Sequence, residues 1–139
     1  MRPTVARRVL IVDDDPGVVK LVRANLQAEG LEVTAAANGA ECLLAVHSQR
    51  PDLIILDVMM PVMDGFQTLR LLKERPETAS IPVIMLTVRR SDVDVLHGWT
   101  SGVDLYLTKP FETSELIAST KRILGDRAAD QAKESEGAP

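Results

Sequence analysis

The sequence predicts an α/β fold in which helices flank a parallel sheet of five strands. Two observations lead to this prediction. Short apolar runs rich in β-branched residues, such as Val9–Val12 and Leu53–Leu56, end on polar side chains. Such runs are typical of strands that are buried on both faces of a parallel sheet. Between these runs the apolar residues recur with helical spacing, and the alternation of strand and helix repeats five times.

The elements can be placed from the positions of these runs. We expect strands over residues 9–12, 32–36, 52–57, 83–87 and 105–108. We expect helices over about residues 16–29, 39–49, 65–75, 91–101 and 113–125.

Capping and turn signals set the expected helix ends. Pro16 can open the first helix, and Asp64 can cap the third. Gly30 and Gly102 each follow a helical pattern and would end it. Residues 76–82, which begin and end with proline, are expected to form a connecting loop.

Composition narrows the class of protein. The chain of 139 residues is the size of one domain, and its 45% hydrophobic content suits a globular protein. The net charge is −4 and no dense Lys/Arg block occurs, so we expect no direct contact with nucleic acid. No apolar run is long enough for a membrane span, and no signal peptide is recognisable. Cys42 is the only cysteine, so we expect a cytoplasmic protein without an internal disulfide.

Polar residues stand at the ends of four of the expected strands. Asp13 and Asp14 follow the first strand, Asp57 ends the third, Thr87 ends the fourth and Lys109 follows the fifth. In parallel α/β sheets the ligand site lies outside the carboxyl ends of the strands. Clustered carboxylates repel one another and call for a cation. The set therefore predicts a site for a divalent cation and a phosphoryl group.

In this order and at these spacings, the residues resemble the receiver domain of two-component response regulators, of the kind found in chemotaxis regulators. Asp57-Val58-Met59-Met60-Pro61, followed by Asp64-Gly65, matches the D-x-x-M-P-x-x-D-G pattern of that family. The resemblance covers residues 8–125. It implies a flavodoxin-like, doubly wound, three-layer fold with five parallel strands in the order 2-1-3-4-5.

The resemblance also assigns roles in the site. It implies that Asp57 accepts the phosphoryl group, because a carboxylate is a competent nucleophile that gives an acyl phosphate. It implies Mg²⁺ as the cofactor, held by Asp13, Asp14, Asp57 and the backbone carbonyl of Met59, with Asp14 as a direct ligand.

Three further residues match functional positions of the family. Lys109 corresponds to the lysine that pairs with the acceptor and the phosphoryl oxygens, and the bond from Lys109 to Pro110 is expected to be cis. Thr87 and Tyr106 match the two switch positions, although Tyr106 is also compatible with an ordinary half-buried strand tyrosine. The chain departs from the family at Val88, where a small residue is usual, and the bulk of Val88 could hinder phosphoryl access or the movement of Tyr106.

The resemblance implies a signalling domain rather than an enzyme, with at most slow self-dephosphorylation. The expected donor is the phosphohistidine of a sensor histidine kinase or a phosphotransfer domain. The expected output is a changed surface around residues 91–101, 105–108 and 113–125, read by a downstream protein or by an output domain absent from this chain. A dimer that depends on phosphorylation is also compatible with the resemblance.

Rival functions fit the sequence less well. A degenerate receiver that only binds proteins commonly lacks one or more of the site residues, and all are present here. An aspartyl phosphatase resembles D-x-D-x-T after the first strand, which residues 13–17 do not match. A flavin-binding flavodoxin needs a phosphate loop rich in Ser, Thr and Gly after that strand, and a P-loop motif is also absent.

The last segment, residues 126–139, has alternating charges and small residues without aliphatic periodicity. We therefore expect a flexible tail or linker. The sequence leaves open whether it leads to an output domain or ends a stand-alone receiver.

Overall fold

The computed structural model describes residues 7–88 and 102–137, with side chains described up to residue 125. The strands are β1 (Arg8–Val12), β2 (Glu32–Ala36), β3 (Leu53–Asp57), β4 (Val83–Thr87) and β5 (Leu105–Thr108). The helices are α1 (Pro16–Gln27), α2 (Gly39–Ser48), α3 (Gly65–Glu74), α4 (Pro76–Ala79) and α6 (Thr113–Gly137). The helix expected over residues 91–101 lies outside the described residues.

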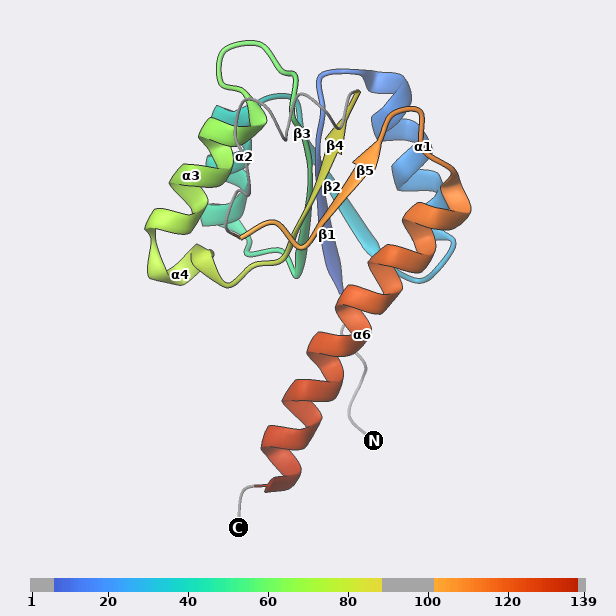
Figure 1. The fold of residues 1–139 in the computed structure, drawn as a ribbon, viewed down its shortest axis with the longest axis vertical. Coiled ribbons are helices and arrows are strands. Elements are labelled where there is room, and N and C mark those ends of the chain that lie inside the picture. Colours follow the sequence, from blue (N-terminus) through green and yellow to red (C-terminus); the bar gives the residue numbers. More distant parts are fainter. Residues whose placement is uncertain (1–6, 89–101, 138–139) are drawn as a thin grey trace.

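The sheet has the topology that the resemblance implied. Its five strands are parallel and lie in the order β2-β1-β3-β4-β5. Figure 1 shows the sheet as the middle of three layers, with α2 and α3 on one side and α1 and α6 on the other. Because β1 and β3 are neighbours, the chain segments that follow them leave the sheet side by side at its carboxyl edge.

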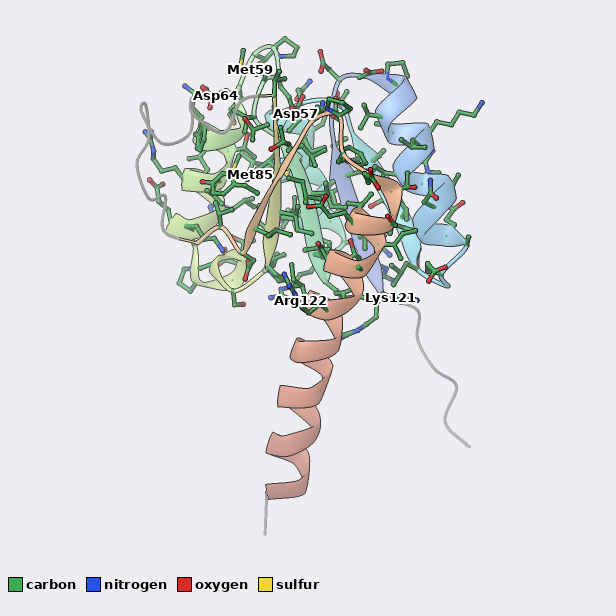
Figure 2. The ribbon with its side chains drawn as sticks, turned by 45° about the vertical axis from the view of Figure 1, so that its right-hand side comes forward. Asp57, Met59, Asp64, Met85, Lys121 and Arg122 are labelled. Carbon is green, nitrogen blue, oxygen red and sulfur yellow. The ribbon has the colours of Figure 1, made fainter. Side chains whose placement is uncertain are left out.

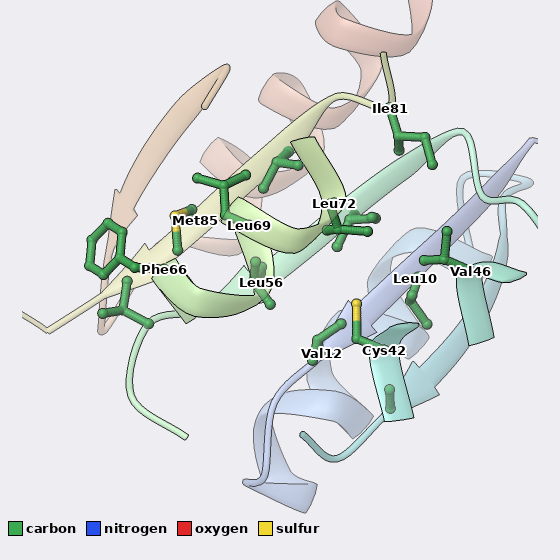
Figure 3. Packing of buried hydrophobic residues seen from close by; sticks show 14 residues of the cluster. Leu10, Val12, Cys42, Val46, Leu56, Phe66, Leu69, Leu72, Ile81 and Met85 are labelled. Carbon is green, nitrogen blue, oxygen red and sulfur yellow. The ribbon is translucent and has the colours of Figure 1, made fainter. Parts of the chain in front are cut away.

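Two apolar clusters hold the layers together. Alternate residues of each strand face opposite sides, so Leu10 and Val12 pack under α2 and α3, while Val9 and Ile11 pack under α1 and α6. Figure 3 shows the first cluster, in which Cys42 lies among aliphatic side chains from the sheet and the helices. The alternation confirms that every central strand is buried on both faces, as the apolar runs predicted.

Aspartate side chains cap α1 and α3. The Asp15 side chain caps α1 by accepting a hydrogen bond from the Gly17 N–H. Asp64 begins α3 with a capping box, in which its carboxylate accepts from the Gln67 N–H and the Gln67 side chain accepts from the Asp64 N–H. After α1, Gly30 takes a φ of 85°, a left-handed conformation that glycine adopts without a steric cost.

Two helix predictions were wrong. The loop expected over residues 76–82 contains the short helix α4, because Pro76 occupies its first turn and Glu77 complements its N-terminus. The last helix does not end near Gly125 but continues to Gly137. Glycine in a helix interior costs only about 1 kcal/mol relative to alanine, and residues 126–134 are mostly helix formers. Figure 1 shows α6 extending beyond the other elements.

Within the described ranges, we found no helix that is both long and apolar enough to span a lipid bilayer.

Candidate functional site

Neighbouring strands bring the predicted acids together. Val12 of β1 pairs with Leu56 of β3, so the next residues, Asp13 and Asp57, stand at the same level of the carboxyl edge. Both side chains are buried, with 2% and 3% of their respective residue surfaces exposed, whereas Asp14 is exposed. One carboxylate oxygen from each of Asp13, Asp14 and Asp57 lies within 4.8 Å of the others. The convergence predicted from the strand order is therefore confirmed.

Lys109 completes the charge arrangement. It follows β5, and its Nζ lies 2.7 Å from Asp13 Oδ2 and 3.4 Å from Asp57 Oδ1. The backbone supports this position, because the Lys109 N–H donates to the Thr87 carbonyl at 2.7 Å. The peptide bond from Lys109 to Pro110 is cis, as the resemblance implied. One ammonium thus bridges the two buried carboxylates.

The electrostatics disfavour the ionised form of the Asp57 carboxylate. Burial, followed by repulsion from Asp13, raises the pKa of Asp57 from 3.8 to about 6, although Lys109 and the Met59 N–H oppose the rise. Burial lowers the pKa of Lys109, but its hydrogen bond to Asp13 and the charges of Asp57 and Asp13 outweigh this effect and raise the pKa. The cluster therefore carries more negative charge than the single lysine offsets, and an added cation would favour the ionised form of Asp57.

Two predicted residues stand on β4, the neighbour of β3, and on β5, the next strand along the sheet. Thr87 ends β4 beside Asp57 and is buried, with 3% of its surface exposed. Tyr106 lies on β5 opposite Met85 of β4, and its ring packs against the cluster under α2 and α3. The Tyr106 hydroxyl is buried and makes no hydrogen bond within the described part of the chain. The structure places Thr87 at the end of the strand beside β3, and the roles of Thr87 and Tyr106 as switches stay a prediction.

Two apolar side chains that follow the ends of β3 and β4 are exposed. Met59 is 68% exposed, and its N–H donates to Asp57 Oδ1 at 3.4 Å. Figure 2 shows Asp57 and Met59 together where the chain leaves β3 toward α3. Val88 is 57% exposed, so much of its bulk faces solvent. Arg89, expected to flank the approach of water to the acceptor, lies outside the described residues.

Two structural features of the chain that follows Asp57 were not predicted. A Cβ at Gly65 would come within 2.4 Å of the Asp57 carbonyl oxygen, so only glycine allows α3 to begin this close to the end of β3. Val62 has a φ of 71° in a γ-turn closed by the Met63 N–H and the Pro61 carbonyl at 2.8 Å. The sequence singled out Gly65 only as the last residue of the match to the D-x-x-M-P-x-x-D-G pattern, and nothing in the residues around Val62 signals a left-handed conformation.

The fold and the site are those of a receiver domain, and the comparison with known proteins gives the same family. The family model of the response regulator receiver domain matches residues 9–121. The chain therefore belongs to the response regulator receiver domain family.

Individual relatives give the same result. The chain is 42% identical over 131 residues to the DNA-binding dual master transcriptional regulator RpaA of Synechocystis, a match that covers 93% of this chain and 54% of RpaA. The chain thus spans about half the length of this curated relative. Because RpaA is named a DNA-binding regulator, the expectation that this protein makes no direct contact with nucleic acid is not confirmed.

Solved structures share the fold. The chemotaxis response regulator CheY4 of Vibrio cholerae superposes with a TM-score of 0.79 at 34% identity, over 86% of this chain and 99% of that one. The receiver domain of the sensor histidine kinase PA1611 from Pseudomonas aeruginosa superposes with a TM-score of 0.79 at 30% identity, over 87% and 99% of the two chains. The PA1611 receiver holds a magnesium ion in its active-site cleft.

Proposed function

We propose that this domain accepts a phosphoryl group on Asp57 from a phosphohistidine of a sensor histidine kinase or a phosphotransfer domain. The observation that carries the proposal is the buried Asp57 carboxylate, which lies 3.4 Å from the Lys109 ammonium within a cluster of three acids. In the reaction an Asp57 oxygen forms a bond to phosphorus while the bond from phosphorus to the imidazole nitrogen breaks. The imidazole leaves with the electron pair, and Asp57 becomes an acyl phosphate.

The donor set fits Mg²⁺. Asp13, Asp14 and Asp57 offer oxygen ligands, which Mg²⁺ prefers, and the exposure of Asp14 leaves room for the waters that this ion retains. The Met59 carbonyl would complete the protein ligands. When bound, Mg²⁺ would offset the negative charge of the carboxylates and of the incoming phosphoryl oxygens.

The chain's own residues supply positioning and charge. Phosphoryl transfer needs little covalent help, so catalysis depends on holding the acceptor and neutralising the equatorial oxygens. The Lys109 ammonium already contacts Asp57 and can reach a phosphoryl oxygen attached to it. The Thr87 hydroxyl and the Val88 N–H are the further donors that we assign to those oxygens. Slow hydrolysis of the acyl phosphate would then reset the domain.

The proposed output is a change of surface on β5, on α6 and on residues 91–101, with Thr87 and Tyr106 as the moving side chains. A downstream protein or a further domain of a longer regulator would read this change.

Incubation of the chain with acetyl phosphate, with and without Mg²⁺, tests the proposal. Intact mass should gain one phosphoryl unit only when Mg²⁺ is present, and Asp57→Asn should abolish the gain. A wild-type chain that gains no mass under these conditions would instead support the rival function, a degenerate receiver that only binds proteins.

A further inference from the structure

A cavity of about 530 Å³ opens beside the acidic cluster. Its lining includes Asp13 and Asp14 after β1, Ala35–Ala37 at the end of β2, and Lys20 and Arg23 of α1. The small alanine side chains leave the space between α1 and β2 open. Two cations of α1 therefore share a cavity with two of the carboxylates that we assign to Mg²⁺.

These two cations have no negative partner on the protein. Lys20 and Arg23 are three residues apart on α1, so their side chains are neighbours on the helix surface and repel each other. No residue of α1 is acidic. Within the described part of the chain, neither side chain forms an ion pair, whereas Lys121 of α6 pairs with Glu29. Two uncompensated positive charges thus line the cavity.

A third acid on the cavity does not compensate them. The Glu41 carboxylate accepts hydrogen bonds from the Ala37 N–H at 3.3 Å and from Asn38 Nδ2 at 3.1 Å. Glu41 also stands in the first turn of α2, where the positive end of the helix dipole offsets negative charge. Its carboxylate is therefore held at the start of α2 and pairs with neither Lys20 nor Arg23.

The proposed reaction brings negative charge to a site that attracts it weakly. Acetyl phosphate is a dianion at neutral pH, and the phosphoryl group of any donor carries negative oxygens. Lys109 offsets one of the three carboxylates of the cluster, and Mg²⁺ would offset the other two, so the loaded site is close to neutral. The chain as a whole has a net charge of −4, which repels the donor. Attraction of the donor then depends on further cations near the site.

We propose that Lys20 and Arg23 are steering residues, which attract an anionic phosphodonor toward the cavity and raise its concentration next to Asp57. This inference rests on the proposed function of Asp57 as the phosphoacceptor. A cleft that presents charge of one sign raises the local concentration of an oppositely charged substrate. The two side chains need not contact the reacting atoms, because the potential depends on their charge rather than on their shape.

The second-order rate constant of phosphorylation by acetyl phosphate, followed by intact mass at saturating Mg²⁺, tests the proposal. The double variant Lys20→Gln with Arg23→Gln should lower this constant about two- to fivefold at low ionic strength, the size expected for two screened charges acting on a dianion. The difference from the wild type should nearly vanish in about 1 M salt, where the Debye length falls to about 3 Å. Lys20→Arg with Arg23→Lys keeps both charges and should keep the wild-type constant.

Calorimetric titration of Mg²⁺ without phosphodonor gives a second readout, which should move in the opposite direction. Removing two positive charges beside Asp13 and Asp14 should lower the Mg²⁺ dissociation constant of the Lys20→Gln, Arg23→Gln variant, by up to about fivefold. Weaker Mg²⁺ binding together with slower phosphorylation would mean that the substitutions distort the site, and would overturn the steering role.

A matched control removes the same amount of charge away from the site. Arg75 and Arg122 are both exposed. Arg75 follows α3, which begins at the carboxyl edge and therefore ends at the other edge, and Figure 2 shows Arg122 on α6 at the opposite end of the sheet from Asp57. Arg75→Gln with Arg122→Gln should leave the rate constant and the Mg²⁺ dissociation constant close to the wild-type values.

The outcomes separate this inference from the function on which it rests. A wild type that gains no phosphoryl group would overturn the proposed function and the steering role together. A phosphorylated wild type whose rate is matched at low salt by Lys20→Gln, Arg23→Gln would overturn the steering role alone. Equal slowing in the control pair would overturn the choice of these two residues, and slowing in the charge-preserving variant would overturn the electrostatic mechanism. Circular dichroism melts establish that each variant is folded.

Discussion

Replacing the acceptor carboxylate should stabilise the metal-free domain in a way that depends on pH. The pKa of Asp57 is raised from 3.8 to about 6, mainly by burial, so its ionised form is disfavoured in the folded state. An asparagine side chain resembles the neutral acid in shape, and its carbonyl oxygen can still accept the hydrogen bonds that reach Asp57 from Met59 and Lys109. The variant Asp57→Asn therefore removes a buried charge with little change in packing.

Proton linkage gives the direction in which the free energy of unfolding changes with pH. Between the unfolded pKa of 3.8 and the folded pKa of about 6, the folded chain holds a proton on Asp57 that the unfolded chain has lost. The stability of the wild type that comes from this group is thus fully present below pH 3.8 and is lost as the pH rises through about 6. The full shift corresponds to about 3 kcal/mol, so we expect Asp57→Asn to gain about 1–3 kcal/mol at neutral and higher pH.

The assay is urea unfolding followed by circular dichroism, with a chelator present, at several values between about pH 4 and about pH 8. The free energy of unfolding of Asp57→Asn should exceed that of the wild type above the folded pKa, and the difference should shrink as the pH falls. Glu74→Gln changes an exposed carboxylate outside the site. It should not show this pH-dependent gain in the free energy of unfolding. A mutant that is less stable than the wild type at neutral pH without metal would refute the electrostatic reasoning.

Three further variants probe the metal, the acyl phosphate and the loop. Asp14→Ala should preserve or raise the thermal stability of the metal-free chain, because an exposed member of the acidic cluster is removed, yet it should lose most Mg²⁺ affinity; an unchanged Mg²⁺ titration would exclude Asp14 as a ligand. Met59→Asn with Arg89→Glu should speed loss of the phosphoryl group roughly tenfold, or about 1.4 kcal/mol of barrier, because polar side chains can orient the attacking water. Decay after removal of the phosphodonor measures this, and an unchanged rate would show that the pair does not gate water. Val62→Gly should stabilise the chain by up to about 1 kcal/mol in urea unfolding, because glycine adopts a positive φ without strain; a less stable variant would mean that the strain at Val62 is smaller than the cost of the entropy that glycine adds to the unfolded chain.

The sequence was sufficient for the features that follow from strand order. Once β1 and β3 are neighbours, the acids after each strand must share one edge, and Asp13 and Asp57 do so. Lys109 was predictable for the same reason, because β5 ends at that edge as well.

Other contacts depend on tertiary structure that no local pattern encodes. The Asp52 carboxylate accepts from the Arg8 N–H and the Asp104 carboxylate accepts from the Val83 N–H, which ties neighbouring strands together at 2.7 and 2.8 Å. The partners lie 44 and 21 residues apart in the chain. Neither bond has a sequence signature, because each acid lies just before its own strand and bonds to the backbone of the neighbouring one.

The errors arose where one residue type has two structural uses. Glycine ends a helix when it takes a positive φ, as Gly30 does, but Gly125 lies within α6 and does not take a positive φ. Val62 shows the converse, since a β-branched residue adopts a positive φ that sequence reasoning reserves for glycine or asparagine.

The most direct test of the central claim is to locate the phosphoryl group. Borohydride reduces an acyl phosphate to the corresponding alcohol, so treatment after phosphorylation by acetyl phosphate and Mg²⁺ converts the modified aspartate to homoserine. Tandem mass spectrometry of the digested chain then identifies the position. We expect homoserine in place of Asp57 alone, and none when Mg²⁺ or acetyl phosphate is omitted. Homoserine in place of Asp13 or Asp14 instead, at comparable yield, would contradict the assignment of Asp57 as the phosphoacceptor.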